Sequence, residues 1–184
     1  MEVWVAQLFP GTLSMKNVHP LFVHFPIAYW TGALFVEFLA VLYKEELHKV
    51  ARWLLYLGTF SAVATLATGF VAESTLAQET GGHHTHSPSH TAIHTHRNWM
   101  VTSSIIGMLV SLHMFLIDRK RKWKRHRWGM LFEVTILVIM MALGADRGGR
   151  LVYTLGVGVA RPPMEEERLP SVNDFQKRRD THVN

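Results

Sequence analysis

Residues 99–145 read WMVTSSIIGMLVSLHMFLI, then DRKRKWKRHR, then WGMLFEVTILVIMMALGA. The first and last parts are long apolar stretches, and the ten residues between them carry seven Lys or Arg side chains. The hydrocarbon core of a bilayer is about 30 Å thick, and a helix of roughly 20 apolar residues crosses it. The pattern therefore predicts two membrane-spanning helices joined by a short basic loop.

Two further apolar stretches precede this pair, at residues 21–43 and 53–72. Three of the four stretches contain an ionisable residue: Glu37 in the first, His113 in the third and Glu133 in the fourth. Because the connections are short, successive helices are expected to lie antiparallel. The sequence predicts an all-α membrane protein, a four-transmembrane-helix up-down bundle.

The distribution of basic residues predicts how this bundle is oriented. Short loops rich in Lys and Arg remain in the cytoplasm, which places the loop at 118–127 there. The His-rich loop at 73–97 and both termini then lie on the outer, periplasmic side of a cytoplasmic membrane. Three parts are expected: an N-terminal outer segment at 1–18, the transmembrane domain at 19–160 and a polar C-terminal tail at 161–184.

Composition narrows the classes of function. In a soluble protein, the net charge of +5 would suggest nucleic-acid binding. Here much of the basic charge lies in one short loop, where it indicates the orientation of the protein in the membrane. No nucleic-acid partner is therefore expected. The chain has no cysteine, which excludes disulfides, Cys-ligated zinc, iron–sulfur clusters and c-type haem. We find no nucleophile–base pair and no phosphate loop, so no enzymatic activity is predicted.

Five residues are candidates for cofactor binding at the outer face: His19, His24, His94, Asn98 and Tyr153. They come from three separate segments that the predicted topology brings to one membrane surface. A b-type haem held by His24 and His94 is the sharpest form of this hypothesis, and a quinone is another. The histidines could equally be interfacial side chains bonded to loop carbonyls, and Asn98 could cap the third helix. The glycines from residue 148 onward are interpreted as a tight reversal.

The predicted outer loop contains a cluster of histidines. Neutral imidazoles bind Zn²⁺, Cu²⁺ or Ni²⁺, so a divalent metal could be held here. The spacing is too irregular to define one tetrahedral site, and a solvated low-complexity loop is the alternative. The candidate metal ligands are His83, His84, His86, His90 and His96.

Glu37, His113 and Glu133 form the last group of candidates, expected toward the cytoplasmic ends of their helices. Ionisable residues inside a membrane tend to face the bundle interior or each other. These three are therefore predicted to converge in an inner polar cluster. Such a cluster could be a static clamp between helices or part of a proton path.

Several of these residues belong to a series of short sequence motifs. The motifs are His19-Pro20, Val23-His24-Phe25-Pro26-Ile27-Ala28, the spacing of His94 and Asn98, and Gly148-Gly149-x-Leu151-Val152-Tyr153-x-x-Gly156-Val157-Gly158-Val159. In this order the chain resembles, over about residues 19–159, the integral membrane proteins called domain of unknown function 2231. The resemblance implies a small four-helix bundle. Some relatives are joined to Rieske-type iron–sulfur domains, which implies a place in membrane electron transport.

Three functions remain open from the sequence. The first is an accessory or structural subunit of a larger bioenergetic membrane complex, respiratory or photosynthetic, with other membrane subunits and lipids as partners. The second is an electron-transfer module carrying a b-type haem near the outer face. The third is a metal-handling membrane protein that uses the His-rich loop. The small size and the missing catalytic set favour the first.

Overall fold

A computed structural model describes residues 17–79 and 88–158 of the chain, and in these residues all regular structure is helical. Four of the helices are long and apolar enough to cross a membrane, which confirms the predicted fold class. The first of them consists of two consecutive helices. In chain order the elements are α3 (His19–Phe22), α4 (His24–Leu42), the 3-10 helix η1 (Glu45–Leu47), α5 (His48–Glu79), α6 (Pro88–Arg119) and α7 (Trp123–Tyr153).

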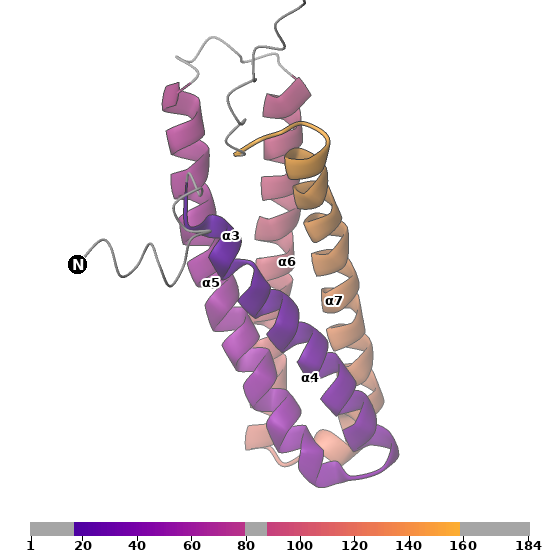
Figure 1. The fold of residues 1–184 in the computed structure, drawn as a ribbon. Helices are drawn as coiled ribbons and strands as arrows, with labels where there is room; N and C mark the ends of the chain where they lie inside the picture. The colour runs from indigo at the N-terminus through magenta and orange to yellow at the C-terminus, as the bar shows by residue number, and fades with distance from the viewer. Residues whose placement is uncertain (1–16, 80–87, 159–184) are drawn as a thin grey trace, which may run out of the picture.

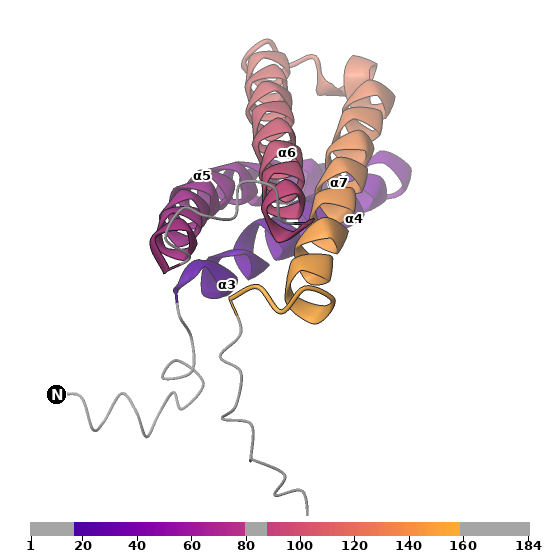
Figure 2. The same ribbon diagram turned by 90° about the horizontal axis from the view of Figure 1, so that it is seen from above.

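The long helices run up and down in one elongated bundle (Figure 1). Viewed from above, α4 packs against α5 and α7, and α6 also packs against both (Figure 2). The turns that join α4 to α5 and α6 to α7 lie at one end, here called the basic end after the loop at 118–127. The other end is called the histidine end. There α3 begins and α7 ends, so both boundaries of the described chain lie at the histidine end (Figure 1).

The helices are longer than the apolar stretches that predicted them. α5 and α6 contain 32 residues each, or about 48 Å at 1.5 Å per residue, against a hydrocarbon core of about 30 Å. Hydropathy detects only the part of a helix that lies in lipid, so it missed the polar turns beyond. The predicted loop at 73–97 is therefore largely helical: α5 continues to Glu79 and α6 begins at Pro88.

The glycine-rich segment also differs from its prediction. Gly148 and Gly149 do not form a tight reversal; both lie within α7, which continues to Tyr153. The chain turns only afterwards, where Gly156 and Gly158 have φ angles of 63° and 75°. Such angles favour glycine because it lacks a Cβ.

A break between α3 and α4 has a direct cause in the sequence. Pro26 has no N–H, so the carbonyl of Phe22, one turn earlier, loses its helical hydrogen bond. Within a membrane such a carbonyl needs another donor. The hydroxyl of Thr65 in α5 lies 3.0 Å from it and shares its one hydrogen between this carbonyl and that of Ser61 in its own helix, 2.8 Å away. The break thereby ties the first transmembrane segment to the second and directs α3 along α5.

The middle of the bundle is organised around Trp30 on α4, which is 2% exposed. Its indole lies between Gly58 of α5 and Gly107 of α6, and a Cβ on either glycine would come within 2.5 Å of a ring atom. Its N–H donates to the hydroxyl of Thr59 at 3.4 Å. Below it, toward the basic end, Leu55, Met114 and other buried apolar side chains complete the core.

The outward faces of the helices carry large apolar side chains, as a lipid-facing surface should. Phe60 on α5 is 76% exposed, and Phe35, Leu109 and Phe132 on the other helices are exposed as well. In water such a surface would favour aggregation, and in a bilayer it is the ordinary solvent contact. The exposed apolar faces therefore agree with the four candidate spans.

Candidate functional site

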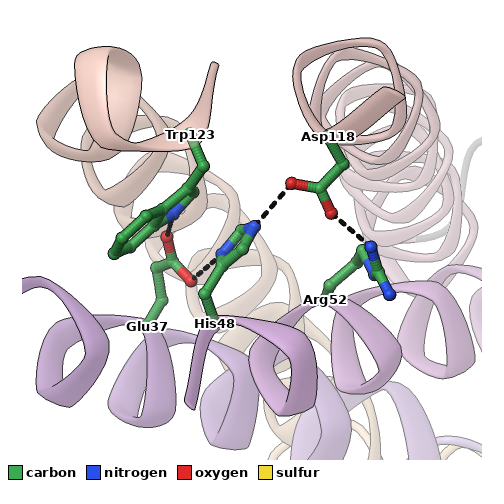
Figure 3. A network of polar contacts seen from close by, with 5 residues as sticks. All are labelled: Glu37, His48, Arg52, Asp118 and Trp123. Carbon is green, nitrogen blue, oxygen red and sulfur yellow. Dashed lines mark hydrogen bonds and ion pairs between the residues drawn. The ribbon is translucent and has the colours of Figure 1, made fainter. Parts of the chain in front are cut away.

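Ionisable side chains inside the bundle gather in two places, one at each end, whereas the polar contact between them, Thr59 with Ser111 at 2.8 Å, joins two hydroxyl groups. The group at the basic end, here called the basic-end cluster, joins all four transmembrane segments (Figure 3). The indole N–H of Trp123 and Nδ1 of His48 donate to the two oxygens of Glu37, at 2.7 and 2.8 Å. Nε2 of His48 donates to Asp118 at 2.8 Å, and Arg52 donates to the other oxygen of Asp118 at 2.6 Å. Glu37 itself is fully buried.

With both carboxyl groups ionised, the hydrogen bonds determine the charge of His48. A carboxylate only accepts, so an imidazole with a carboxylate at each ring nitrogen donates from both and is an imidazolium. His48 and Arg52 then balance Glu37 and Asp118, and the cluster is neutral as a whole. The Trp123 ring stacks on His48, with centroids 4.6 Å apart. Next to the cluster, Nε of Arg52 and the hydroxyl of Tyr56 are buried without a hydrogen-bond partner among the described residues.

The three ionisable residues predicted to meet on this side do not form one cluster. Glu37 points inward to His48, whereas His113 and Glu133 form a separate pair between α6 and α7. Nδ1 of His113 lies 2.9 and 2.8 Å from the two oxygens of Glu133. Both side chains are partly exposed on the outside of the bundle, at 48% and 32%. The predicted convergence is therefore wrong for Glu37 and correct for the other two.

At the histidine end, His19 of α3 lies against α5. The hydroxyl of Thr68 donates to the carbonyl of Thr65 at 2.9 Å, so its oxygen accepts from Nδ1 of His19, 3.3 Å away. The ring rests on Gly69, where a Cβ would come 3.1 Å from Cε1. Because Nδ1 carries the hydrogen, the neutral ring has its lone pair on Nε2.

His96 of α6 repeats this arrangement against α7. Its Nδ1 donates to the carbonyl oxygen of Gly144 at 2.9 Å. Its ring rests on Gly148, where a Cβ would come 2.8 Å from Cε1. Gly148 is therefore needed for close approach of an imidazole and not for a turn. Once again Nε2 holds the lone pair.

His19 and His96 both lie toward the histidine end of the bundle, although they come from different helix pairs. Both are partly buried. The two residues, here called the histidine pair, are thus two neutral imidazoles with oriented rings and available Nε2 atoms. Each donates its other nitrogen hydrogen to an oxygen, which is the usual arrangement of a histidine that ligates a metal.

The other predicted outer-face residues do not join the histidine pair. His24 is exposed at the beginning of α4 and makes no contact with His94 among the described residues. His94 instead contacts His90, with their Nε2 atoms 3.0 Å apart, and Nδ1 of His94 lies 3.7 Å from Glu73. The side chain of Tyr153 is 91% exposed.

Asn98 is exposed and lies well inside α6, so the alternative that it caps this helix is wrong. The helix begins early enough for His94 and Asn98 to share a face, but that face is not the one that carries His96.

Of the histidines predicted to bind a divalent metal, His83, His84 and His86 lie outside the described residues. His90 and His96 both lie on α6 but have different neighbours: His90 contacts His94, and His96 contacts α7. Within 17–79 and 88–158, no group of three or more His, Cys, Asp or Glu side chains is arranged to hold a metal ion.

Sequence reasoning missed His48, Arg52, Asp118 and Trp123 as members of a buried cluster. All four were placed in loops or at the interface, because the apolar stretches begin or end next to them. One signal was available: Asp118 is the only acidic residue in a loop with seven basic ones. A lone carboxylate at the end of a membrane helix favours a buried basic partner.

Comparison with known proteins gives one result. The family described as "Predicted membrane protein (DUF2231)" matches residues 15–161, which include all four transmembrane segments. No curated protein and no solved structure matches the chain.

Proposed function

The chain belongs to the DUF2231 family of predicted membrane proteins, and from this premise we propose that it is a membrane electron-transfer protein in which His19 and His96 would hold a b-type haem. One observation carries the proposal: two imidazoles on separate helix pairs, both toward the histidine end, each donate from Nδ1 to an oxygen and keep Nε2 available. The sequence suggested haem with a different pair, His24 and His94, which do not contact each other.

The number of ligands favours a haem over a bare metal ion. Zn²⁺ in proteins usually takes three or four side-chain ligands, and the histidine pair offers two. A b-type haem would need only two side-chain ligands from the protein, and His19 and His96 would supply them. Two imidazoles without a neighbouring carboxylate therefore match haem better. Bound there, the iron would supply a reversible one-electron change.

The residues of the chain itself would orient and tune the ligands. Thr68 and the carbonyl of Gly144 each accept a hydrogen bond from Nδ1 and so hold the ring in the tautomer that leaves Nε2 free; an acceptor at Nδ1 also raises the basicity of Nε2. Gly69 and Gly148 let the rings lie directly against helix backbone. In the proposed orientation the basic end faces the cytoplasm, so electrons would be exchanged with partner proteins at the outer face.

A second candidate is an accessory subunit of a larger bioenergetic complex, without a cofactor of its own. It is favoured by the basic-end cluster, in which Glu37, His48, Asp118 and Arg52 neutralise one another and tie the helices together. Such a cluster serves stability rather than chemistry. This candidate predicts that the histidine pair, too, is only a helix contact.

A reduced-minus-oxidised optical spectrum of the protein purified in mild detergent separates the two candidates. We expect an α-band in the b-haem region, and we expect His19→Ala and His96→Ala each to abolish it. Haem added to protein purified without it should restore the band in the wild type but not in His19→Ala or His96→Ala.

His24→Ala and His94→Ala are matched controls, because both residues lie at the same end of the bundle outside the histidine pair. They should keep the band. A well-folded wild-type protein that binds no added haem would exclude the electron-transfer proposal and favour the accessory subunit. Loss of the band in the two control variants alone would assign the ligands to His24 and His94.

A further inference from the structure

The pair of His113 and Glu133, here called the membrane-facing pair, lies in an unusual place. His113 is about 9 Å from the end of α6 and Glu133 about 15 Å from the beginning of α7, measured along the helices, so both lie within the apolar spans. Yet they are partly exposed on the outside of the bundle. The same face carries exposed apolar side chains, among them Leu109, Leu116 and Ile136.

Polar groups exposed at this depth are costly because lipid offers no hydrogen bonds. The contact between His113 and Glu133 uses only part of the hydrogen-bonding capacity of the two side chains. Nδ1 of His113 meets both carboxyl oxygens, at 2.9 and 2.8 Å, and the described residues offer Nε2 no further partner. One donor position and several oxygen lone pairs are left over.

The low polarity of the surrounding lipid determines which hydrogen-bonding groups the pair exposes. A net charge in lipid is strongly disfavoured, so the pair holds either an imidazolium with a carboxylate or a neutral imidazole with a carboxylic acid. In both forms Nε2 carries a hydrogen and the carboxyl group retains free acceptor positions. The membrane-facing pair therefore presents a donor and an acceptor side by side.

A surface with one donor beside one acceptor is complementary to itself. When two copies meet about a two-fold axis, each surface patch faces its own equivalent, so the Nε2–H of one His113 can meet the Glu133 of the other copy. Gly129, one turn before Glu133 on α7, is exposed, and no atom lies within 4 Å of the Cβ that it lacks. Small residues of this kind let membrane helices approach closely.

We propose that this face of α6 and α7 is the interface with a second copy of the chain, and that two membrane-facing pairs bond to each other across it. The surface of α5 around Leu57, Phe60 and Val63 is the matched contrast, since its exposed side chains are all apolar. That face contacts lipid. The proposal does not depend on haem, because the histidine pair lies at the other end of the bundle.

Disulfide cross-linking in native membranes tests the interface, and the chain suits it because it has no cysteine of its own. Ile136→Cys lies on the proposed interface, and Phe60→Cys lies at a similar depth on the contrast face. With a membrane-soluble oxidant we expect a covalent dimer from Ile136→Cys and none from Phe60→Cys. Equal cross-linking of both, or a product that joins the chain to a different protein, would overturn the proposal.

A second experiment removes the polar groups of the membrane-facing pair without changing the core of the bundle. The double variant His113→Leu with Glu133→Leu replaces two partly exposed polar residues with apolar ones on a surface that already contacts lipid. We expect a folded monomer, with the cross-linking of Ile136→Cys reduced at least tenfold. An undiminished dimer in this background would show that the membrane-facing pair does not hold two copies together.

Discussion

At the scale of single residues, His48 shows how a charge is kept inside this membrane protein. Its ring lies between two carboxylates, Glu37 and Asp118, each 2.8 Å from one of its nitrogens. Removing one partner of such a buried arrangement leaves an uncompensated charge, which costs far more than the pair contributes as a whole. The two residues are 11 and 70 positions away from His48, so the cluster forms only when the helices have assembled.

We predict that Glu37→Leu lowers the free energy of unfolding by about 3–5 kcal/mol, because it leaves His48 and the N–H of Trp123 without their shared acceptor. Unfolding in mixed detergent micelles, followed by tryptophan fluorescence, measures the change. Glu45→Ala is the control: its contact with Lys124 at 2.8 Å is exposed, and it should cost about 1 kcal/mol or less. Equal effects of the two variants would contradict a special role for burial.

Which side of each helix faces the bundle interior explains which residues could be predicted. On α4, Pro26, Trp30, Ala33 and Glu37 are buried and lie three or four residues apart, so the inward position of Glu37 follows from helical spacing. On α6, Ser103 and Gly107 are buried, and a step of seven residues back from Ser103 leads to His96. His94 lies on another side of the helix. Sequence reasoning identified the histidines but did not establish which side of its helix each one occupies, so it paired His24 with His94 and not His19 with His96.

At the scale of elements, the break between α3 and α4 positions His19. A continuous helix would carry the chain straight on, whereas Pro26 interrupts it and Thr65 holds the freed carbonyl of Phe22. The prolines and the end of the apolar stretch were visible in the sequence. The acceptor role of Phe22 was not, because it depends on which α5 side chain lies beside the break.

We predict that Thr65→Val speeds amide hydrogen exchange in residues 19–23 about tenfold, because it removes the donor that holds this segment against α5. Mass spectrometry of the exchanged protein measures it. In a Pro26→Ala background residue 26 has an N–H for the Phe22 carbonyl, so the same substitution should have less than half the effect. Thr135→Val, whose hydroxyl bonds within its own helix, is the control. Identical effects of Thr65→Val in both backgrounds would contradict this account.

For the whole molecule, hydropathy was sufficient to predict four spans and their up-down order. It could not predict where the helices end, because the polar turns beyond the membrane are stabilised by contacts such as Arg97 with Glu73, 2.8 Å apart. Nor could it predict the two separate polar centres, which depend on how α4, α5, α6 and α7 pack around Trp30.

The orientation in the membrane is a prediction at this scale, from the seven basic residues of the loop at 118–127. We expect a membrane-impermeant maleimide to label Thr154→Cys in intact spheroplasts, and to label Lys120→Cys only after the membrane is opened. Both positions are exposed, so accessibility alone does not separate them. The reverse labelling pattern would place the histidine end in the cytoplasm.

Trp30 has a consequence for permeability. Its indole fills the space between Gly58 and Gly107 at mid-depth and is itself almost inaccessible. A proton crosses a protein along a file of water molecules or bonded polar groups, and a close-packed aromatic ring at this level interrupts such a file. We therefore expect no proton path through the middle of the bundle, between the polar centres at its two ends.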